Sequence, residues 1–395
     1  MLPLAEELDR RLTALREQGL RRELRRVDSA PGPRIIIDGK TLLNFSSNDY
    51  LGLAGHPALK EAAVKCIEKF GAGAGASRLI CGSLAPFHEL EQALADFKKT
   101  EAALSFSTGY AAALGTITAL AGKDDIIILD KLVHASIVDA AKLSGAKLRV
   151  YAHNDLEDLE DKLKWATDAA TTEADATRHI LIITESIFSM DGDSAPLREI
   201  VALKNKYGAW LMVDEAHATG IIGQAGRGLA DELGVSSQIE IQMGTLGKAV
   251  GASGGFICGS RVLVDYLVNR ARSFIFSTAP VPAAAAAAAA GIKMLQSAEG
   301  EARRAQLCAR ITEFKTGLGN KSPATSSAIL PLILGEEARA LTAANQLREQ
   351  NIFVPAIRYP TVAKGAARLR ITLTAAHSAD DVATLIQALE PITHS

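Results

Sequence analysis

Two short motifs in the second half of the chain place an acid and an amine at the ends of neighbouring apolar runs. Asp214 follows one run, with His217 three residues later, and Lys248 follows the next run, three residues after Thr245. A lysine amine can form a Schiff base with an aldehyde. A buried carboxylate can keep a pyridine nitrogen protonated, which makes the ring an electron sink. The pair therefore predicts a site for pyridoxal 5'-phosphate.

A phosphate site is predicted where a helix begins near residue 110. Gly109 and Tyr110 follow Ser107 and Thr108. The free amides and the positive end of the helix dipole suit a phosphate. Serine and threonine in this position also act as ordinary helix caps, which is the alternative interpretation. The Thr245 hydroxyl offers a further donor to a phosphate oxygen.

Three more side chains are candidates on their position alone. His134 follows the apolar run 126–129, where its ring could stack on a planar cofactor or serve a purely structural role. Arg368 and Arg370 alternate with apolar residues and point to one face of a predicted strand. Both arginines could be solvated, whereas a buried one would bind a substrate carboxylate in a bidentate manner.

Two nucleotide-binding alternatives are weakened by the glycine pattern. The run Asp-Glu-Ala-His at 214–217 also occurs in nucleic-acid-stimulated ATPases, which need a G-x-x-x-x-G-K-[ST] loop that opens a helix. The one Gly-Lys-Thr run, at 39–41, has Arg34 five residues before Gly39 and leads into a strand-like run. The glycine loop at 71–75 follows a helix and lacks the G-x-G-x-x-G spacing. We expect neither ATPase nor dinucleotide chemistry.

The bulk composition suits a cytosolic protein. The chain has 395 residues and a formal net charge of -2, which gives no electrostatic case for nucleic acid or a membrane surface. Its four cysteines form no C-x-x-C pair, so a reduced compartment is expected and a zinc site is not. The acidic start does not match a signal peptide, and no run of about 18 strongly apolar residues is present.

Alternating helical and apolar extended segments predict an α/β fold with a mostly parallel sheet covered by helices. The candidate residues follow the predicted strands, so they should meet at the carboxyl edge of the sheet. We divide the chain into an N-terminal helix and hairpin segment at 1–49, a large cofactor-binding domain at 50–291 and a smaller C-terminal α+β domain at 292–395.

The motifs together resemble the α-oxoamine synthases, a branch of the aspartate aminotransferase-like (fold-type I) pyridoxal phosphate enzymes. Val133 and Glu215 depart from the usual family pattern, and neither removes a catalytic group. The resemblance extends from about residue 19 to residue 377 and depends on the motifs at 43–53, 107–110, 134–136, 184–193, 213–217, 244–248 and 368–377.

The resemblance implies specific cofactor contacts. Lys248 would carry the cofactor, Asp214 would pair with the ring nitrogen, and His217 and Ser189 would bond near the ring hydroxyl. His134 would stack on the ring. Gly109, Tyr110 and Thr245 would hold the phosphate. A further phosphate contact, from Thr278 of the neighbouring subunit, is implied because sites of this family lie at a homodimer interface.

The resemblance also implies the substrates. The runs 43–53 and 356–361 favour members that join L-alanine to a pimeloyl thioester over glycine-using members such as 2-amino-3-ketobutyrate ligase. The substrate contacts would come from Arg22, Asn48, His134, Thr361 and Arg370. The thioester carrier, coenzyme A or an acyl carrier protein, stays open, as does the part that the basic stretch 21–26 plays.

Overall fold

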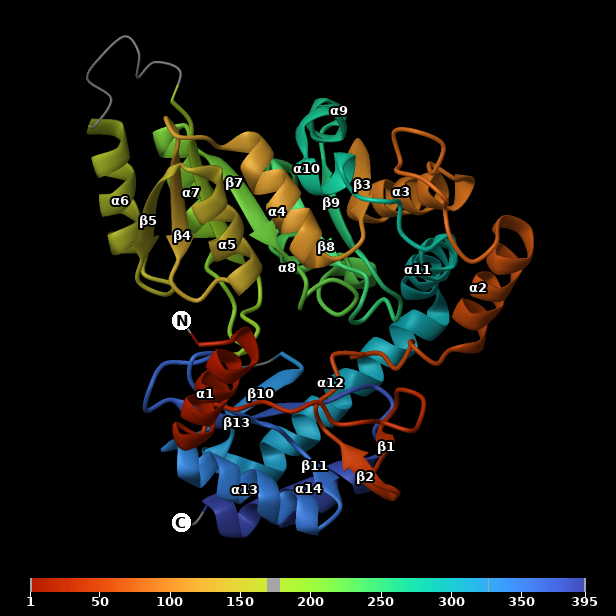
Figure 1. Ribbon diagram of the computed structural model, residues 1–395, viewed down its shortest axis with the longest axis vertical. Coiled ribbons are helices and arrows are strands. Elements are labelled where there is room, and N and C mark those ends of the chain that lie inside the picture. Colours follow the sequence, from red (N-terminus) through yellow and green to blue (C-terminus); the bar gives the residue numbers. More distant parts are fainter. Residues whose placement is uncertain (1, 169–177, 326, 394–395) are drawn as a thin grey trace.

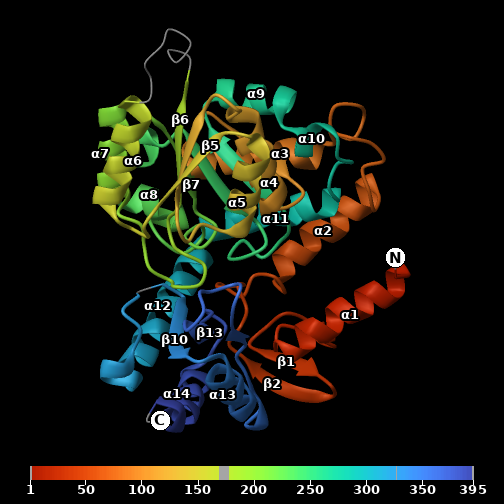
Figure 2. The same ribbon diagram turned by 60° about the vertical axis from the view of Figure 1, so that its left-hand side comes forward.

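The computed structural model describes residues 2–168, 178–325 and 327–393. The large sheet and most of the helices form one body, and segments from both halves of the chain, including β1, β2, β10 and β13, form a second body below it (Figure 1). Helix α1 projects from this second body (Figure 2). Within the described residues, no helix is both long and apolar enough to cross a membrane.

The large sheet has seven strands in the order β3-β9-β8-β7-β6-β4-β5. Strand β9 runs antiparallel to both of its neighbours, and the other ladders are parallel. The predicted mostly parallel sheet is thus confirmed. The strands are β3 (Ala102–Phe106), β4 (Ile126–Asp130), β5 (Lys147–Tyr151), β6 (Ile180–Glu185), β7 (Trp210–Asp214), β8 (Ile241–Thr245) and β9 (Gly255–Gly259).

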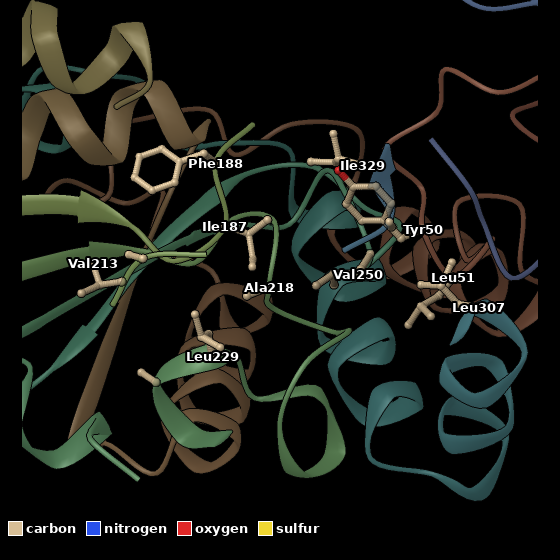
Figure 3. Packing of buried hydrophobic residues seen from close by; sticks show 14 of the residues in the cluster. Tyr50, Leu51, Ile187, Phe188, Val213, Ala218, Leu229, Val250, Leu307 and Ile329 are labelled. Carbon is tan, nitrogen blue, oxygen red and sulfur yellow. The ribbon is translucent and has the colours of Figure 1, made fainter. Parts of the chain in front are cut away.

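Both faces of this sheet are buried, which explains the continuous apolar runs. In β4, Ile126 and Ile128 belong to one core cluster, while Ile127 and Leu129 belong to another. Successive side chains of a strand point to opposite faces, so each face contributes to its own core. The first core extends toward the second body, where Tyr50 and Ile329 pack near Val250 (Figure 3).

The helices cover the sheet and link the two bodies. Helix α11 packs on α2 and α3, and it continues toward α12, which runs down into the second body (Figure 1). The helices are α1 (Leu4–Glu17), α2 (Pro57–Phe70), α3 (Ala85–Lys98), α4 (Gly109–Leu120), α5 (Ala135–Ser144), α6 (Leu156–Asp168), α7 (Leu197–Tyr207), α8 (Leu229–Glu232), α9 (Arg261–Arg270), α10 (Arg272–Ile275), α11 (Pro282–Leu295), α12 (Ala298–Leu318), α13 (Glu337–Glu349) and α14 (Ala379–Thr393).

Two three-stranded sheets form the second body. One joins β1 (Arg34–Ile37), β2 (Lys40–Asn44) and β11 (Ile352–Phe353), and the other joins β10 (Ile329–Gly335), β13 (Ala367–Thr372) and β12 (Ala356–Ile357). The predicted hairpin is confirmed, because β1 and β2 pair antiparallel and Asp38 and Gly39 between them both have positive φ. Since β2 pairs with β11, residues from both ends of the chain share one sheet. Helix α11 runs through residue 291, so the domain division stays a prediction.

Candidate active site

Four parallel strands deliver polar side chains to one edge of the large sheet. Strands β6, β7 and β8 end at Glu185, Asp214 and Thr245, and β4 ends four residues before His134. Parallel strands place their carboxyl ends together, which is where open α/β sheets bind ligands. Lys248 follows β8 by three residues, so the two motifs that predict the cofactor site lie at this same edge.

A chain of short hydrogen bonds starts at Lys248. Its Nζ lies 2.7 Å from Nε2 of His217, and Nδ1 of His217 lies 2.6 Å from the Tyr50 hydroxyl. The Tyr50 hydroxyl lies 3.2 Å from Oδ1 of Asn48, which also accepts a 3.2 Å bond from Nη1 of Arg370. Arg370 in turn donates from Nε to the Ser189 carbonyl at 2.7 Å. Most of the residues predicted around the ring and the substrate carboxylate are therefore joined in one network.

One assignment of protons satisfies the Lys248 end of this network. Lys248 donates to Nε2 of His217, the Nδ1–H of His217 donates to Tyr50, and Tyr50 donates to Asn48. His217 is then neutral. Burial lowers the pKa of His217 well below its usual value, and the positive charge of Lys248 lowers it further. The electrostatics thus favour the same protonation state as the hydrogen bonds.

The amine and the acid of the first motif are both buried. Burial lowers the pKa of Lys248 to about 8, although the charges of Asp214 and Glu185 oppose this shift. An amine with that pKa is partly neutral near pH 7 and can act as a nucleophile or a base. Burial also raises the pKa of Asp214, while Lys248 and the backbone amide of Ala216 oppose the shift. Asp214 accepts that amide at 2.9 Å.

The two arginines of β13 are buried rather than solvated. Arg368 is 5% exposed and Arg370 is 6% exposed. Arg368 donates at 2.6 Å to Asp191 and at 3.0 Å to the Met190 carbonyl, so it fixes the loop beyond β6. Arg370 reaches the Lys248 network instead. Its predicted role toward a substrate carboxylate stays a prediction.

His134 lies at the start of α5 and caps it. Its Nδ1 accepts from the backbone amide of Ser136 at 3.2 Å and lies 2.8 Å from the Ser136 hydroxyl. Burial lowers the pKa of His134, which the nearby negative charge of Asp214 partly opposes. The ring is therefore neutral at pH 7, with the proton assigned to Nε2. A neutral imidazole fits the predicted stacking role.

The predicted phosphate cradle lies at the start of α4, and its role stays a prediction. Thr108 caps the helix by accepting from Ala111 at 3.0 Å, which confirms the capping alternative for its side chain. The first backbone amides of a helix have no carbonyl partner within the helix, so those of Gly109 and Tyr110 are available to a ligand. A Cβ at Gly109 would lie only 3.7 Å from the Thr245 side chain, so Thr245 faces the cradle. The Thr245 hydroxyl donates to Gly254 at 3.0 Å.

Three further predicted residues lie outside both the Lys248 network and the start of α4. Arg22 donates to Thr361 at 3.2 Å, so these two substrate candidates contact each other. Thr278 is exposed and forms an isolated β-bridge with Ser77. Its predicted contact with a neighbouring subunit stays a prediction, as do the roles of Arg22 and Thr361.

The sequence predictions assigned no role to two residues of the site. Tyr50, which bonds to His217, reads in the sequence as an ordinary core aromatic, and only its place in the 43–53 motif signals more. Glu185 ends an apolar run, which is the signal that identified Asp214. Its role could not be assigned without knowing that it lies beside Asp214 in the sheet.

The site fits pyridoxal phosphate. A buried acid without a salt bridge among the described residues suits a ring nitrogen cation, and a buried amine of lowered pKa suits an aldehyde. A Cβ at Gly255 would lie 2.5 Å from the Thr108 carbonyl and 2.6 Å from the Gly109 nitrogen, so β9 approaches the cradle as only glycine can. Lys248, Asp214 and the amides of Gly109 and Tyr110 would hold the cofactor.

Comparison with known proteins agrees with this chemistry. The sequence model for class I and II aminotransferases matches residues 40–389. A protein of Geotalea daltonii named 8-amino-7-oxononanoate synthase is 46% identical over 98% of this chain and 97% of its own length. An Anaeromyxobacter protein of the same name is 50% identical over 98% of this chain and 95% of its own.

Solved structures give the same picture. A serine palmitoyltransferase from S. paucimobilis with PLP bound superposes with a TM-score of 0.90 at 30% identity, covering 100% of this chain and 99% of its own. An 8-amino-7-oxononanoate synthase from Francisella tularensis gives 0.75 at 31% identity, covering 89% and 97%.

The chain belongs to the class I and II aminotransferase family of pyridoxal phosphate enzymes, and its cofactor is pyridoxal 5'-phosphate. Within this family it groups with the relatives named 8-amino-7-oxononanoate synthase, which confirms the resemblance to the α-oxoamine synthases.

Proposed function

We propose that the enzyme condenses L-alanine with a pimeloyl thioester and releases 8-amino-7-oxononanoate, carbon dioxide and the free thiol carrier, a step of biotin biosynthesis. The observation that carries this proposal is the hydrogen-bond network from Lys248 through His217, Tyr50 and Asn48 to Arg370. It places a base of lowered pKa in one network with an arginine that can hold a carboxylate. The names of the curated relatives support the product, and the resemblance of the sequence motifs supports the two substrates.

The residues divide the work between binding and proton transfer. Arg370 and Asn48 would orient the alanine carboxylate, because a guanidinium forms paired hydrogen bonds with that group. Lys248 would release the cofactor when alanine binds and then take the α-proton with its free amine. When bound, the cofactor ring withdraws the electrons left by deprotonation and by loss of carbon dioxide. Asp214 would keep the ring nitrogen protonated for both steps.

The acyl donor would approach past the N-terminal segment. Arg22 and Thr361, which are hydrogen-bonded to each other, are proposed to contact the acyl chain. In the same segment Arg21 pairs with Glu23 and Arg26 pairs with Asp28. Two of the four arginines at 21–26 are therefore partly neutralised, and the segment favours neither coenzyme A nor an acyl carrier protein. We also propose that the enzyme is a cytoplasmic homodimer.

The choice of amino acid is tested by the visible spectrum of the bound cofactor. L-alanine and glycine are added separately to the purified holoenzyme, followed by pimeloyl-CoA or acetyl-CoA. We expect a spectral change with alanine and a further change on adding pimeloyl-CoA. A response only to glycine with acetyl-CoA would replace the proposal with a glycine-using synthase such as 2-amino-3-ketobutyrate ligase.

A further inference from the structure

Glu185 lies beside Asp214 at the carboxyl edge of the large sheet. The two residues end the neighbouring parallel strands β6 and β7, and their Cα atoms are in register. Side chains in register on adjacent strands point to the same face of a sheet. Both are buried, with Glu185 2% exposed and Asp214 5% exposed. The sheet therefore holds two carboxyl groups side by side in the core of the cofactor site.

No cation pairs with either acid among the described residues. The Lys248 amine bonds to His217 instead. Backbone amides of His134 and Ser189 donate toward the Glu185 carboxyl group, yet its Oε1 is buried with no hydrogen-bond partner. Glu215, the next residue after Asp214 in the chain, does have a cationic partner, because it pairs at 2.6 Å with Lys98. A buried acid without such a partner is costly to ionise.

Two adjacent buried carboxyl groups cannot both ionise freely, so one retains its proton. Burial raises the pKa of Glu185 to about 8, and the negative charge of Asp214 raises it as well, while Lys248 opposes the shift. The titratable groups that face Glu185 are Asp214 on β7, Lys248 beyond β8 and His134 beyond β4. Asp130, at the end of β4, bonds to His153 instead.

We propose that Glu185 is a positioning residue that carries a proton at neutral pH and so leaves a single negative charge, on Asp214, to face the ring nitrogen of the cofactor. Ionisation of Glu185 at higher pH places a second negative charge at the site and strengthens the hold on cations there. This inference deepens the proposed site. It uses the cofactor but none of the proposed substrates, so it can fail while the proposed reaction stands, and the reverse also holds.

The first test follows the visible absorption of the bound cofactor from pH 6 to pH 10 in the wild type and in Glu185→Gln. Glutamine mimics the protonated acid at every pH. We expect the two proteins to bind pyridoxal phosphate with the same affinity at pH 7, within about twofold, and the midpoint of the spectral transition to fall by about one pH unit in the variant. Superimposable transitions, or a tenfold loss of affinity at pH 7 in a folded variant, would overturn the proposal.

The second test is read first in the wild-type protein, so it does not depend on whether Glu185→Gln folds. An infrared difference spectrum of the wild-type protein between pH 6.5 and pH 9.5 should show the loss of a protonated carboxyl band. Glu215→Gln is the matched control, because Glu215 is also buried and follows Asp214 in the chain but is paired with Lys98. The difference spectrum of this variant should show the same carboxyl band as the wild type. Absence of the band from the wild type would contradict the proposal. Where Glu185→Gln folds, it should lack the band, and a persisting band would assign the proton to another acid.

Discussion

The reactivity of Lys248 arises from what surrounds its amine. Burial lowers the pKa of Lys248 to about 8, and the amine donates at 2.7 Å to a neutral His217. A neutral neighbour adds no positive charge to the site, and Asp214 keeps the amine from losing its proton altogether. The amine is thus poised to exchange a proton near neutral pH, which both the cofactor attachment and the proposed α-proton transfer require.

Replacing Lys248 with alanine is expected to lower turnover by about three orders of magnitude or more, because the amine proposed to hold the cofactor and to take the proton is lost. Product formation measured by mass spectrometry checks this. Lys60→Ala, an exposed lysine on α2, is the control and should retain full activity. Near-normal product formation by the Lys248 variant would rule out the assignment.

Tyr50→Phe is expected to destabilise the protein by about 1 to 3 kcal/mol and to slow turnover, because Nδ1 of the buried His217 loses its partner. Urea unfolding and initial rates measure the two effects. Tyr266→Phe removes a half-exposed hydroxyl, which bonds to the Ala119 carbonyl, and should change neither by much. Equal effects of the two substitutions would show that the Tyr50 hydroxyl has no special role.

The sequence identified those site residues that combine a reactive side chain with a place shortly after a predicted strand. Asp214 and Lys248 stand directly after predicted strands, so the rule that ligands gather at carboxyl edges places them together. Tyr50 contacts His217 across 167 residues of chain, and no local pattern reports such a contact. The same rule places Glu185 at this edge, but its role depends on which strand lies next to β6, and strand order is a tertiary property.

The loop beyond β6 is held from two sides. Arg368 and Arg370, from β13 in the second body, bond to Asp191 and to the Ser189 carbonyl. On the other side, His153 bridges Asp130 at 3.0 Å and Asp193 at 2.8 Å. The loop carries Ser189, which is proposed to contact the cofactor, so these contacts from two bodies set its position.

The His153 bridge predicts a pH-dependent contribution to stability. Burial lowers the pKa of His153, but the hydrogen bonds to Asp130 and Asp193 outweigh this and raise it to about 10. Since the folded state binds the proton more tightly than the unfolded state, the stabilisation is complete below about pH 6.5 and is lost as the pH rises to about 10. His153→Gln should therefore cost about 2 kcal/mol at pH 6 and much less at pH 10.

Urea unfolding of the wild type and of His153→Gln at both pH values measures this difference. Asn205→Ala, which removes an exposed hydrogen bond to Gln238, is the control and should cost little at either pH. A cost of the His153 substitution that does not vary with pH would mean that the histidine is neutral in the folded protein.

Sequence patterns predicted elements well where both faces of a strand are apolar, as in β4, β6 and β7. They missed β9, whose two terminal glycines suggest a loop, although close packing against the start of α4 requires Gly255. They also missed β5, which lies at the edge of the sheet and alternates charged with apolar residues. In both cases the neighbouring elements, rather than local preference, determine the strand.

The apolar face of helix α1 is exposed to solvent in the single chain. The predicted N-terminal helix is confirmed as α1, but its residues Leu4, Leu8, Leu12 and Leu15 are 75%, 46%, 47% and 40% exposed within the chain. Thr278, proposed to reach a neighbouring cofactor, is exposed as well. Both observations agree with the proposed homodimer.

Mixed dimers test whether Thr278 acts across an interface. Lys248→Ala and Thr278→Glu each remove activity from their own dimers in this arrangement, the second because a carboxylate repels the phosphate. Unfolding and refolding the two together should restore roughly a quarter of wild-type activity, because half of the random dimers then contain one intact site. No recovery, with refolded wild type fully active, would place Thr278 outside the partner's site.

The fate of the alanine carboxyl group tests the proposed reaction most directly. L-alanine labelled with carbon-13 in its carboxyl group is incubated with pimeloyl-CoA and the holoenzyme, and both products are measured by mass spectrometry. We predict that each molecule of 8-amino-7-oxononanoate is unlabelled and is matched by one molecule of labelled carbon dioxide. Labelled pyruvate without carbon dioxide release would show an aminotransferase and contradict the account.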